Sequence, residues 1–283
     1  MCRGVRMKLP KYENMSEYQP KVYDCFPFFN ELDLLELRFN ELNDFVDKFV
    51  LIEATKTHAG KPKPLYFQDN IDRFEKFSDK IISVAIDFAN ASAHTCGDSR
   101  MRENYQRNQI IQVIKNCNPE DVIILSDVDE IPHPEALEKA IKISGVSVLE
   151  QSMYYYYMNM VDKEEPLWLW GTRVFRMKDV GQQTLQDIRV GGGTHVSNGG
   201  WHFSFLGGAE KVKAKIEAFL HQEYNLGYFT NTKRIERVMA EGKDLFGRKG
   251  HSYSPIPIDQ TFPKYLLENY GKYRQYIKEL EPM

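Results

Sequence analysis

Two uninterrupted apolar runs constrain the fold of this chain more than any other feature of its sequence. They are residues 49–52 (Phe-Val-Leu-Ile) and residues 122–125 (Val-Ile-Ile-Leu). Four apolar residues in succession suit a strand that is covered on both faces, as in a parallel sheet. Glu53 follows the first run directly, and Asp127 follows the second after one serine. The runs therefore predict a largely parallel sheet with acidic side chains at the carboxyl ends of two strands, where such sheets bind ligands.

The segments around these runs alternate between strand and helix patterns. Up to residue 143 the predicted elements are strands at 22–26 and 81–86, helices at 99–116 and 134–143, and a helix on Leu32, Leu35, Phe39 and Leu42 with Asn30 as candidate N-cap. This order predicts an α/β fold. The second half has a mixed pattern, with predicted strands at 152–160, 172–177 and 201–205, a helix on Ala209, Val212, Ile216 and Phe219, and a last helix at 263–280.

Composition and charge exclude several classes of protein. The net charge of −3 over 283 residues argues against a nucleic-acid binder with a broad basic face. No apolar stretch approaches the roughly 18 residues of a membrane helix, and the polar start contains no signal segment. The four cysteines form no CxxC pair, which disfavours a zinc site. We expect a cytoplasmic protein with a loose arm at residues 1–20 and one domain at residues 21–283.

The most informative motif is Asp127-Val128-Asp129, directly after the second apolar run. Residues i and i+2 at a strand end point the same way, so the two carboxylates converge. A hard divalent cation such as Mg²⁺ or Mn²⁺ offsets their repulsion and takes its other ligands from phosphates and water. The motif therefore indicates an enzyme that expels a nucleoside diphosphate, with a solvated helix-capping turn as the alternative.

Two other interpretations of the acidic motif can be tested on the sequence. A calcium EF-hand loop needs an oxygen ligand and then a glycine where this chain has Ile131 and Pro132, so it is excluded. A phosphatase of the haloacid-dehalogenase type would use Asp127 as its nucleophile. It should carry a GDxxxD-like pattern downstream, which the chain lacks. The phosphatase stays as a weaker alternative.

Basic residues near the acidic motif have two interpretations. Arg102 and Arg107 belong to the helix that precedes the acidic strand. They are candidates for binding a diphosphate, and the alternative is a solvated helix face with a Glu103–Arg107 pair. Three lysines, at positions 211, 213 and 215, are predicted to lie on the solvated side of their helix.

The tryptophans are candidates for contact with a sugar. Trp168 and Trp170 alternate on a predicted strand, so they share one face and either line a groove or pack. Gly199 and Gly200 precede Trp201 and His202. This sequence is typical either of a mobile loop that delivers a ring and an imidazole or, as we favour, of a core tryptophan.

Several blocks, in order along most of the chain, resemble glycosyltransferase family 17, the family of β-1,4-mannosyl-glycoprotein β-1,4-N-acetylglucosaminyltransferases. The blocks are residues 30–39 (NELDLLELRF), 49–53, 60–67, 121–132, 200–204 (GWHFS) and 263–270 (PKYLLENY). The resemblance implies a GT-A-like single domain with a mostly parallel, Rossmann-like sheet flanked by helices and a mixed C-terminal half. It also implies a UDP-sugar donor (UDP-GlcNAc), a divalent metal, a glycan acceptor and inversion at the anomeric carbon. Asp127 and Asp129 match the DxD motif of the family.

A mechanism follows as a hypothesis from this resemblance. Asp127 and Asp129 hold Mn²⁺ or Mg²⁺, with His202 as a candidate third ligand. The donor-binding candidates are Glu53, Arg102 and Arg107 together with Asp127. The acceptor-binding candidates are Trp168, Trp170 and Trp201, and the candidate bases are Glu130 and Asp187. The alternative is a glycan- or nucleotide-sugar-binding module without catalysis, which would have no need of a diphosphate–metal site.

Overall fold

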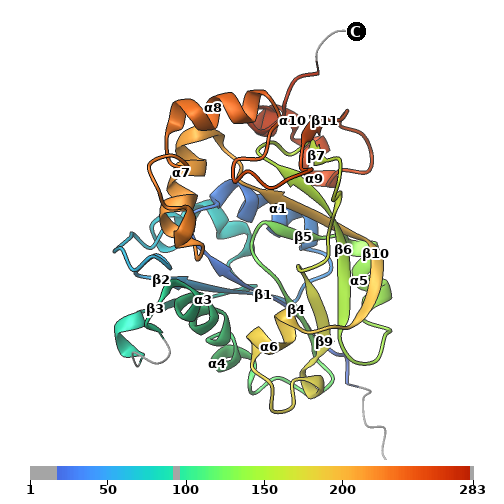
Figure 1. Ribbon diagram of the computed structural model, residues 1–283. Coiled ribbons are helices and arrows are strands. Elements are labelled where there is room, and N and C mark those ends of the chain that lie inside the picture. Colours follow the sequence, from blue (N-terminus) through green and yellow to red (C-terminus); the bar gives the residue numbers. More distant parts are fainter. Residues whose placement is uncertain (1–17, 92–95, 281–283) are drawn as a thin grey trace, which may run out of the picture.

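The structure, a computed structural model, describes residues 18–91 and 96–280 (Figure 1). The predicted arm at 1–20 lies outside the described residues except for its last three positions. Within the described part, one mixed sheet of eleven strands runs through the molecule, with helices on both of its faces. The fold is therefore α/β, as the sequence predicts, but the sheet as a whole is mixed and not largely parallel.

The first half of the chain forms the parallel part of this sheet. Its strands are β1 (Val22–Phe28), β2 (Lys48–Ala54), β3 (Ile81–Ile86) and β4 (Val122–Leu125). They lie in the order β3-β2-β1-β4, and each neighbouring pair is parallel. The two apolar runs form most of β2 and all of β4, and both are buried. The predicted parallel arrangement is confirmed for these four strands.

Helices cover both faces of the parallel part. On one face, α1 (Leu32–Leu42), the 3₁₀ helix η1 (Gln68–Phe77) and α5 (Pro134–Ala140) pack through Leu35, Phe39, Phe74 and Leu137. On the other face lie α3 (Ser99–Asn108), α4 (Ile111–Ile114) and α6 (Leu185–Val190), packed through Ile110, Ile114, Leu185 and Ile188. The short 3₁₀ helix η2 (Phe88–Asn90) precedes α3.

Two helix predictions in this half are wrong in detail. The residue at the N-cap of α1 is Glu31, not Asn30, and no side chain caps the helix. The predicted helix at 99–116 is divided into α3 and α4. The backbone keeps helical angles at Gln109 and Ile110. The backbone hydrogen bonds there, however, join residues three apart instead of four, as in the bond from Ile110 N–H to the Arg107 carbonyl oxygen, so the helix tightens into a 3₁₀ turn.

The second half builds the antiparallel part around β6 (Ser147–Tyr155). This strand is antiparallel to β7 (Met160–Asp162), β8 (Leu167–Trp168) and β9 (Arg173–Arg176), and parallel to β10 (Thr194–Ser204). The antiparallel pair β4–β9 joins the two parts. The sheet is completed by β5 (Glu130–Pro132) beside β10 and by β11 (Tyr253–Pro255) beside β7.

The helices that follow β10 gather at one end of the molecule, at the top of the view in Figure 1. The longer ones are α7 (Gly208–Ala218) and α8 (Thr232–Ala240), which contact each other. The predicted helix at 263–280 is instead a series of short pieces, α9 (Lys264–Glu268), α10 (Tyr270–Tyr273) and the 3₁₀ helix η5 (Arg274–Tyr276). The chain also has short 3₁₀ helices at η3 (Met177–Asp179) and η4 (Gln222–Tyr224).

Two of the three strand predictions of the second half need correction, and the third, at 172–177, is confirmed as β9. The predicted strand at 152–160 is two strands, because Tyr156 adopts a positive φ of 68° and turns the chain between β6 and β7. The strand predicted at 201–205 begins at Thr194 and contains Gly199 and Gly200. A Cβ atom at Gly200 would lie 2.1 Å from the carbonyl oxygen of Ile131, so the close pairing of β10 with β5 requires glycine there.

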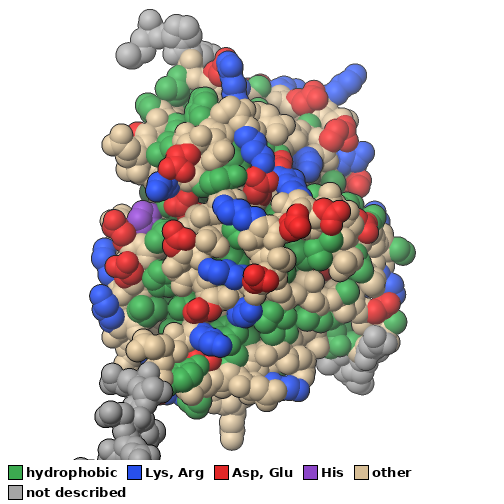
Figure 2. Space-filling view, turned by 180° about the vertical axis from the view of Figure 1, so that it is seen from behind, with side chains coloured by type: hydrophobic (Ala, Val, Ile, Leu, Met, Phe, Trp, Pro, Cys, Tyr) green, Lys and Arg blue, Asp and Glu red, His purple; other side chains and the backbone are tan. Residues whose placement is uncertain are grey.

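The surface seen in Figure 2 carries charges of both signs, and its acidic and basic side chains are interspersed over the described residues. In the part of the chain that the structure describes, no helix is both long enough and apolar enough to cross a bilayer.

Candidate functional site

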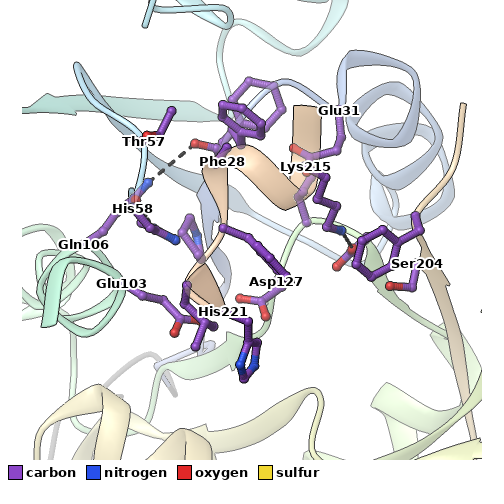
Figure 3. Close-up of a pocket in the computed structure, with 18 of the residues that line it drawn as sticks. Phe28, Glu31, Thr57, His58, Glu103, Gln106, Asp127, Ser204, Lys215 and His221 are labelled. Atoms are coloured by element: carbon purple, nitrogen blue, oxygen red, sulfur yellow. Dashed lines mark hydrogen bonds and ion pairs between the residues drawn. The ribbon is translucent and has the colours of Figure 1, made fainter. Parts of the chain in front are cut away.

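The acidic turn lies between β4 and β5, at the carboxyl ends of the parallel strands. It borders a cavity of about 270 Å³. The walls come from the end of β1, the loop after β2, α3, and the segment from β10 through α7 (Figure 3). The residues labelled in the figure that line this cavity are Phe28, Glu31, Thr57, His58, Glu103, Gln106, Asp127, Ser204, Lys215 and His221. The predicted location of a ligand site beyond the strand ends is thus matched by a cavity.

One buried arginine holds the backbone of the acidic turn from behind. Arg38 on α1 donates from Nε and Nη2 to the two carboxylate oxygens of Asp24, at 2.7 and 2.5 Å, and from Nη2 to Ser126 Oγ at 2.6 Å. Its Nη1 donates to the carbonyl oxygens of Asp127 and Glu130, at 3.0 and 2.8 Å. We call Asp24, Arg38 and Ser126 the turn-holding cluster, because they fix the path from which the acidic side chains project.

Asp127 projects from this turn toward the cavity between two arginines. Arg107 of α3 donates to Oδ1 at 2.6 Å, and Arg189 of α6 donates to Oδ2 at 3.3 Å. The carboxylate keeps a third of its surface exposed. Although partial burial opposes ionisation, the two guanidinium groups lower the pKa of Asp127 to about 2. Asp127 is therefore a carboxylate at neutral pH that is open to a ligand.

Asp129 projects to the same cavity and is held by different elements. Lys215 of α7 donates to its Oδ2 at 2.7 Å, and His202 Nε2 of β10 lies 3.7 Å from its Oδ1. Burial opposes ionisation, but Lys215 and His202 together hold the pKa of Asp129 well below its usual range. The predicted solvated position of Lys215 is wrong, because this lysine lines the cavity. We call Asp127, Asp129, Arg107, Arg189 and Lys215 the cavity cluster.

Glu130 lies in the wall of the cavity, but its oxygens are already engaged. Oε1 accepts hydrogen bonds from Trp168 Nε1 at 2.7 Å and from Arg189 at 2.6 Å. Oε2 accepts one from the backbone N–H of Asp127 at 3.0 Å. The side chain is fully buried. This geometry lets Glu130 orient Asp127 and Arg189. Its predicted role as a base stays a prediction.

Asp187, the other candidate base, lies away from the cavity. It is exposed in the first turn of α6, where it forms a capping box with Thr184. Its Oδ2 accepts from the hydroxyl and the backbone N–H of Thr184, at 2.7 and 2.9 Å. The structure thus gives Asp187 a capping contact and does not bring it to the acidic turn.

Two of the donor-binding candidates, Glu53 and Arg102, contact neighbouring segments of the chain and do not line the cavity. Glu53 is buried at the end of β2 and accepts from Lys63 Nζ at 3.0 Å and from the N–H of Phe67 at 3.1 Å. Burial raises the pKa of Glu53 more than Lys63 lowers it. Lys63, and not Glu53, lines the cavity. Arg102 donates to the carbonyl oxygens of His58 and Cys96, at 2.6 and 2.9 Å, and so holds the loop that carries His58.

The three tryptophans have different surroundings. Trp168 lines the cavity, with its ring centroid 4.7 Å from that of His202. Trp201 is buried in β10 and donates from Nε1 to the carbonyl oxygen of Thr261 at 2.9 Å, so the mobile-loop interpretation is wrong and the core interpretation is confirmed. Trp170 lies beyond the end of β8 and is 66% exposed. The structure brings Trp168 alone of the three to the cavity.

The acidic pair fits the chemistry of a divalent metal only in part. Asp127 and Asp129 supply the carboxylate oxygens that Mg²⁺ and Mn²⁺ prefer. Within residues 18–91 and 96–280, however, no three His, Cys, Asp or Glu side chains are grouped so that they could hold an ion. His202 Nδ1 is buried and has no hydrogen-bond partner in the described part of the chain. Such a metal would take its remaining ligands from substrate phosphates and water, as Mg²⁺ commonly does.

Several residues that line the cavity or contact its acidic side chains were not identified from the sequence. Lys215 flanks the apolar stripe of α7, next to Ile216 and three residues after Val212. This position beside the buried face is the one feature of the sequence that could have indicated that Lys215 is not on the solvated side. Arg189 comes from a short helix 62 residues after Asp127, and no pattern connects the two. His58 and Gln106 meet at 2.9 Å across the other wall (Figure 3). Burial lowers the pKa of His58, which favours a neutral imidazole.

Fold and cavity together define an α/β protein with a cavity at the carboxyl ends of its parallel strands that is lined by ion-paired carboxylates. The chain belongs to glycosyltransferase family 17, since the model of that family matches residues 6–277. The resemblance seen in the sequence is thereby confirmed.

Curated relatives carry one common name, beta-1,4-mannosyl-glycoprotein 4-beta-N-acetylglucosaminyltransferase. The protein of Homo sapiens is 33% identical over 306 residues, which cover 94% of this chain and 57% of that protein. The protein of Rattus norvegicus is 24% identical over 311 residues, which cover 95% and 57% respectively. The chain therefore spans a little more than half the length of these relatives.

Proposed function

We propose that this chain is an inverting glycosyltransferase of GT-A-like architecture that moves a sugar, N-acetylglucosamine, from UDP-GlcNAc to a hydroxyl of a glycan. The family and the name of the relatives support the reaction class. One structural observation carries the assignment to the cavity. Asp127 and Asp129 project from one turn into one cavity, and basic side chains contact both carboxylates. Paired carboxylates with neighbouring cations suit a diphosphate and its metal.

The diphosphate of the donor lies beside the cavity cluster in this proposal. Asp127 and Asp129 would hold Mn²⁺ or Mg²⁺, which when bound offsets the negative charge that grows on the departing diphosphate. Arg107 and Arg189 keep Asp127 ionised and oriented. Lys215 does the same for Asp129 and brings a positive charge to the wall of the cavity.

The nucleoside has a separate wall at the end of β1. Phe28 and Phe29 line the cavity there, together with Thr57 and His58 from the loop after β2. Lys63 lines the same wall and forms an ion pair with Glu53. The aromatic rings offer a packing surface for a base, and the neighbouring polar groups offer hydrogen bonds to it. We therefore assign the nucleoside contact to Lys63 and leave Glu53 and Arg102 as supports of this wall.

The test is thermal unfolding with UDP-GlcNAc, with and without Mn²⁺. A ligand that binds only the folded state raises the melting temperature. We expect a rise that requires Mn²⁺, and we expect it to be lost in Asp127→Asn. Asp72→Asn, an exposed position on η1, is the matched control and should keep the rise.

The outcomes separate the competing functions. A rise of the same size in Asp127→Asn would place the donor elsewhere. No rise with UDP-GlcNAc, but one with a different nucleotide-sugar, would replace the donor. A rise without any release of UDP in the presence of glycan would favour the binding module without catalysis.

A further inference from the structure

A second cavity of about 220 Å³ adjoins the cavity of the acidic turn. The two cavities share three lining residues, which are Glu31, Phe205 and Lys215. The second cavity extends from this junction between the start of α1 and the start of α7. A molecule in the second cavity would thus meet the contents of the first at Glu31 and Lys215.

Glu31 differs from the other carboxylates of the first cavity. In that lining, Glu103, Asp127, Asp129 and Glu130 are each within ion-pair distance of an arginine or lysine. Glu31 has no such partner in the described part of the chain. Its Oε2 accepts a hydrogen bond from the N–H of Asn30 at 2.9 Å, and no hydrogen bond to Oε1 is found among the described residues. One of its oxygens is therefore available to a proton of a ligand.

The position of Glu31 relates it to the acidic turn. Figure 3 shows Glu31 on the same side of the cavity as Lys215, which binds Asp129. Burial would lower the pKa of Lys215, but the carboxylates of Asp129 and Glu31 raise it. Glu31 is thus close enough to influence the lysine beside the proposed diphosphate site.

The second cavity has the mixed lining that a sugar requires. Arg73 and Tyr276 both hydrogen-bond to the carboxylate of Asp33, which gives a polar wall. Met158 and Leu206 supply apolar surface in the same cavity. A sugar presents hydroxyl edges and apolar ring faces, and mixed linings of this kind recognise such ligands.

We propose that the second cavity binds the acceptor sugar and that Glu31 is the base that accepts the proton of its attacking hydroxyl. This inference rests on the proposed function. In the step, the O–H bond of the acceptor breaks and its proton passes to Glu31. The acceptor oxygen forms the new bond to the anomeric carbon. The bond from that carbon to the diphosphate breaks, and its electron pair leaves with UDP.

The first variant is Glu31→Gln, in which the amide oxygen still accepts the hydrogen bond of Asn30. The readout is UDP release from UDP-GlcNAc and Mn²⁺, with an oligosaccharide that ends in β-1,4-linked mannose, and with water alone as acceptor. We expect kcat to fall about 100-fold or more, with the KM for UDP-GlcNAc and the donor-induced rise in melting temperature unchanged. Glu138→Gln, an exposed position on α5, should keep the wild-type rate.

The pH profile distinguishes a base from a residue that only positions the substrate. In the wild type the ionisation of the base gives an acidic limb to kcat/KM, and this limb should be absent in Glu31→Gln. A variant that keeps the limb, or keeps the wild-type kcat, overturns the assignment of Glu31.

The second variant, Leu206→Trp, fills the proposed acceptor cavity. We expect transfer to the oligosaccharide to fall at least tenfold while UDP release to water and donor binding persist. Unchanged transfer would overturn the acceptor cavity. Absence of a donor-induced rise in the wild type would instead contradict the proposed function itself, so the two failures are distinguishable.

Discussion

The turn-holding cluster and the cavity cluster lie on opposite sides of one turn and use the same chemistry differently. Asp24 and Arg38 are both fully buried, and every nitrogen of the guanidinium donates a hydrogen bond. In the cavity cluster Asp127 is one-third exposed, and Nε of both Arg107 and Arg189 is buried without a hydrogen-bond partner among the described residues. A closed aspartate–arginine pair fixes a backbone, whereas a pair that is open to a cavity and incompletely satisfied is prepared for a ligand.

The largest expected effect is the loss of stability when the turn-holding cluster is broken. Arg38→Leu leaves Asp24 buried without its counter-ion and frees the carbonyl groups of the turn. Breaking a buried pair in this way lowers the free energy of unfolding by about 3–5 kcal/mol. Urea unfolding measures it, with Arg73→Leu as the control, because the partly exposed pairs of Arg73 contribute only about 0–1 kcal/mol. Equal effects in the two variants would remove the distinction between the clusters.

An intermediate effect on stability is expected at Glu130, which contacts Arg38 of the turn-holding cluster through its carbonyl oxygen and Arg189 of the cavity cluster through its side chain. Glu130→Gln removes the negative charge that Arg189 faces. Both carboxylate oxygens of Glu130 accept hydrogen bonds, so the NH₂ group of the glutamine would face a donor, either the N–H of Asp127 or the side chains of Arg189 and Trp168. We expect the free energy of unfolding to fall by about 1–3 kcal/mol and the donor-induced rise in melting temperature to shrink. Glu150→Gln, on the same sheet and half-buried, is the control. Lost transfer with unchanged stability and unchanged donor binding would instead identify Glu130 as the base.

The smallest expected effect is the pH dependence of the free energy of unfolding that the ion pairs of the cavity cluster contribute. The pKa values of Asp127 and Asp129 lie below the value of about 3.9 for a free aspartate. Their contribution to folding is therefore complete above about pH 4 and is lost as the pH falls toward 2. For the partly exposed Asp127 it amounts to on the order of 1 kcal/mol. Urea unfolding of the wild type and Asp127→Asn at pH 7, 5 and 3 should show a constant difference from pH 7 to 5 that shrinks by pH 3.

A difference that disappears between pH 7 and 5 would contradict this account. It would mean that the carboxylate is protonated well above its expected range, and hence that Arg107 and Arg189 do not hold it in the ionised form.

Elements that depend on neighbours in sequence were predictable. The run at 122–125 forms β4 with the predicted ends, because a continuous apolar run marks a strand that is buried on both faces. The two acidic residues that follow face one cavity, as predicted, but they project from a turn, closed by a hydrogen bond from the Glu130 N–H to the Asp127 carbonyl oxygen at 3.1 Å, and not from an extended chain. The strand at 81–86 is likewise confirmed as β3. The strand β4 is buried throughout and leaves a continuous apolar run, whereas β3 lies at the edge of the sheet, is only partly buried, and has exposed Ser83 in its apolar pattern.

Elements that depend on distant partners were not predictable. Lys215 meets Asp129 across 86 positions, and Arg189 meets Asp127 across 62, and no local pattern encodes either pair. The strand predicted at 172–177 is confirmed as β9, but the strands predicted at 152–160 and 201–205 have wrong bounds for a related reason. Their register depends on a positive φ at Tyr156 and on the close approach of Gly200 to Ile131, which are tertiary constraints.

The position of β4 between the parallel and antiparallel parts has a consequence for the order of events in biosynthesis. When the first half of the chain has been made, Asp127 and Arg107 already exist, but Asp129 still lacks the lysine that is synthesised 86 residues later. The charge on the nascent turn is balanced only once β10 and α7 have docked. In the proposed function, donor binding at this turn therefore requires that the second half of the chain has folded against the first.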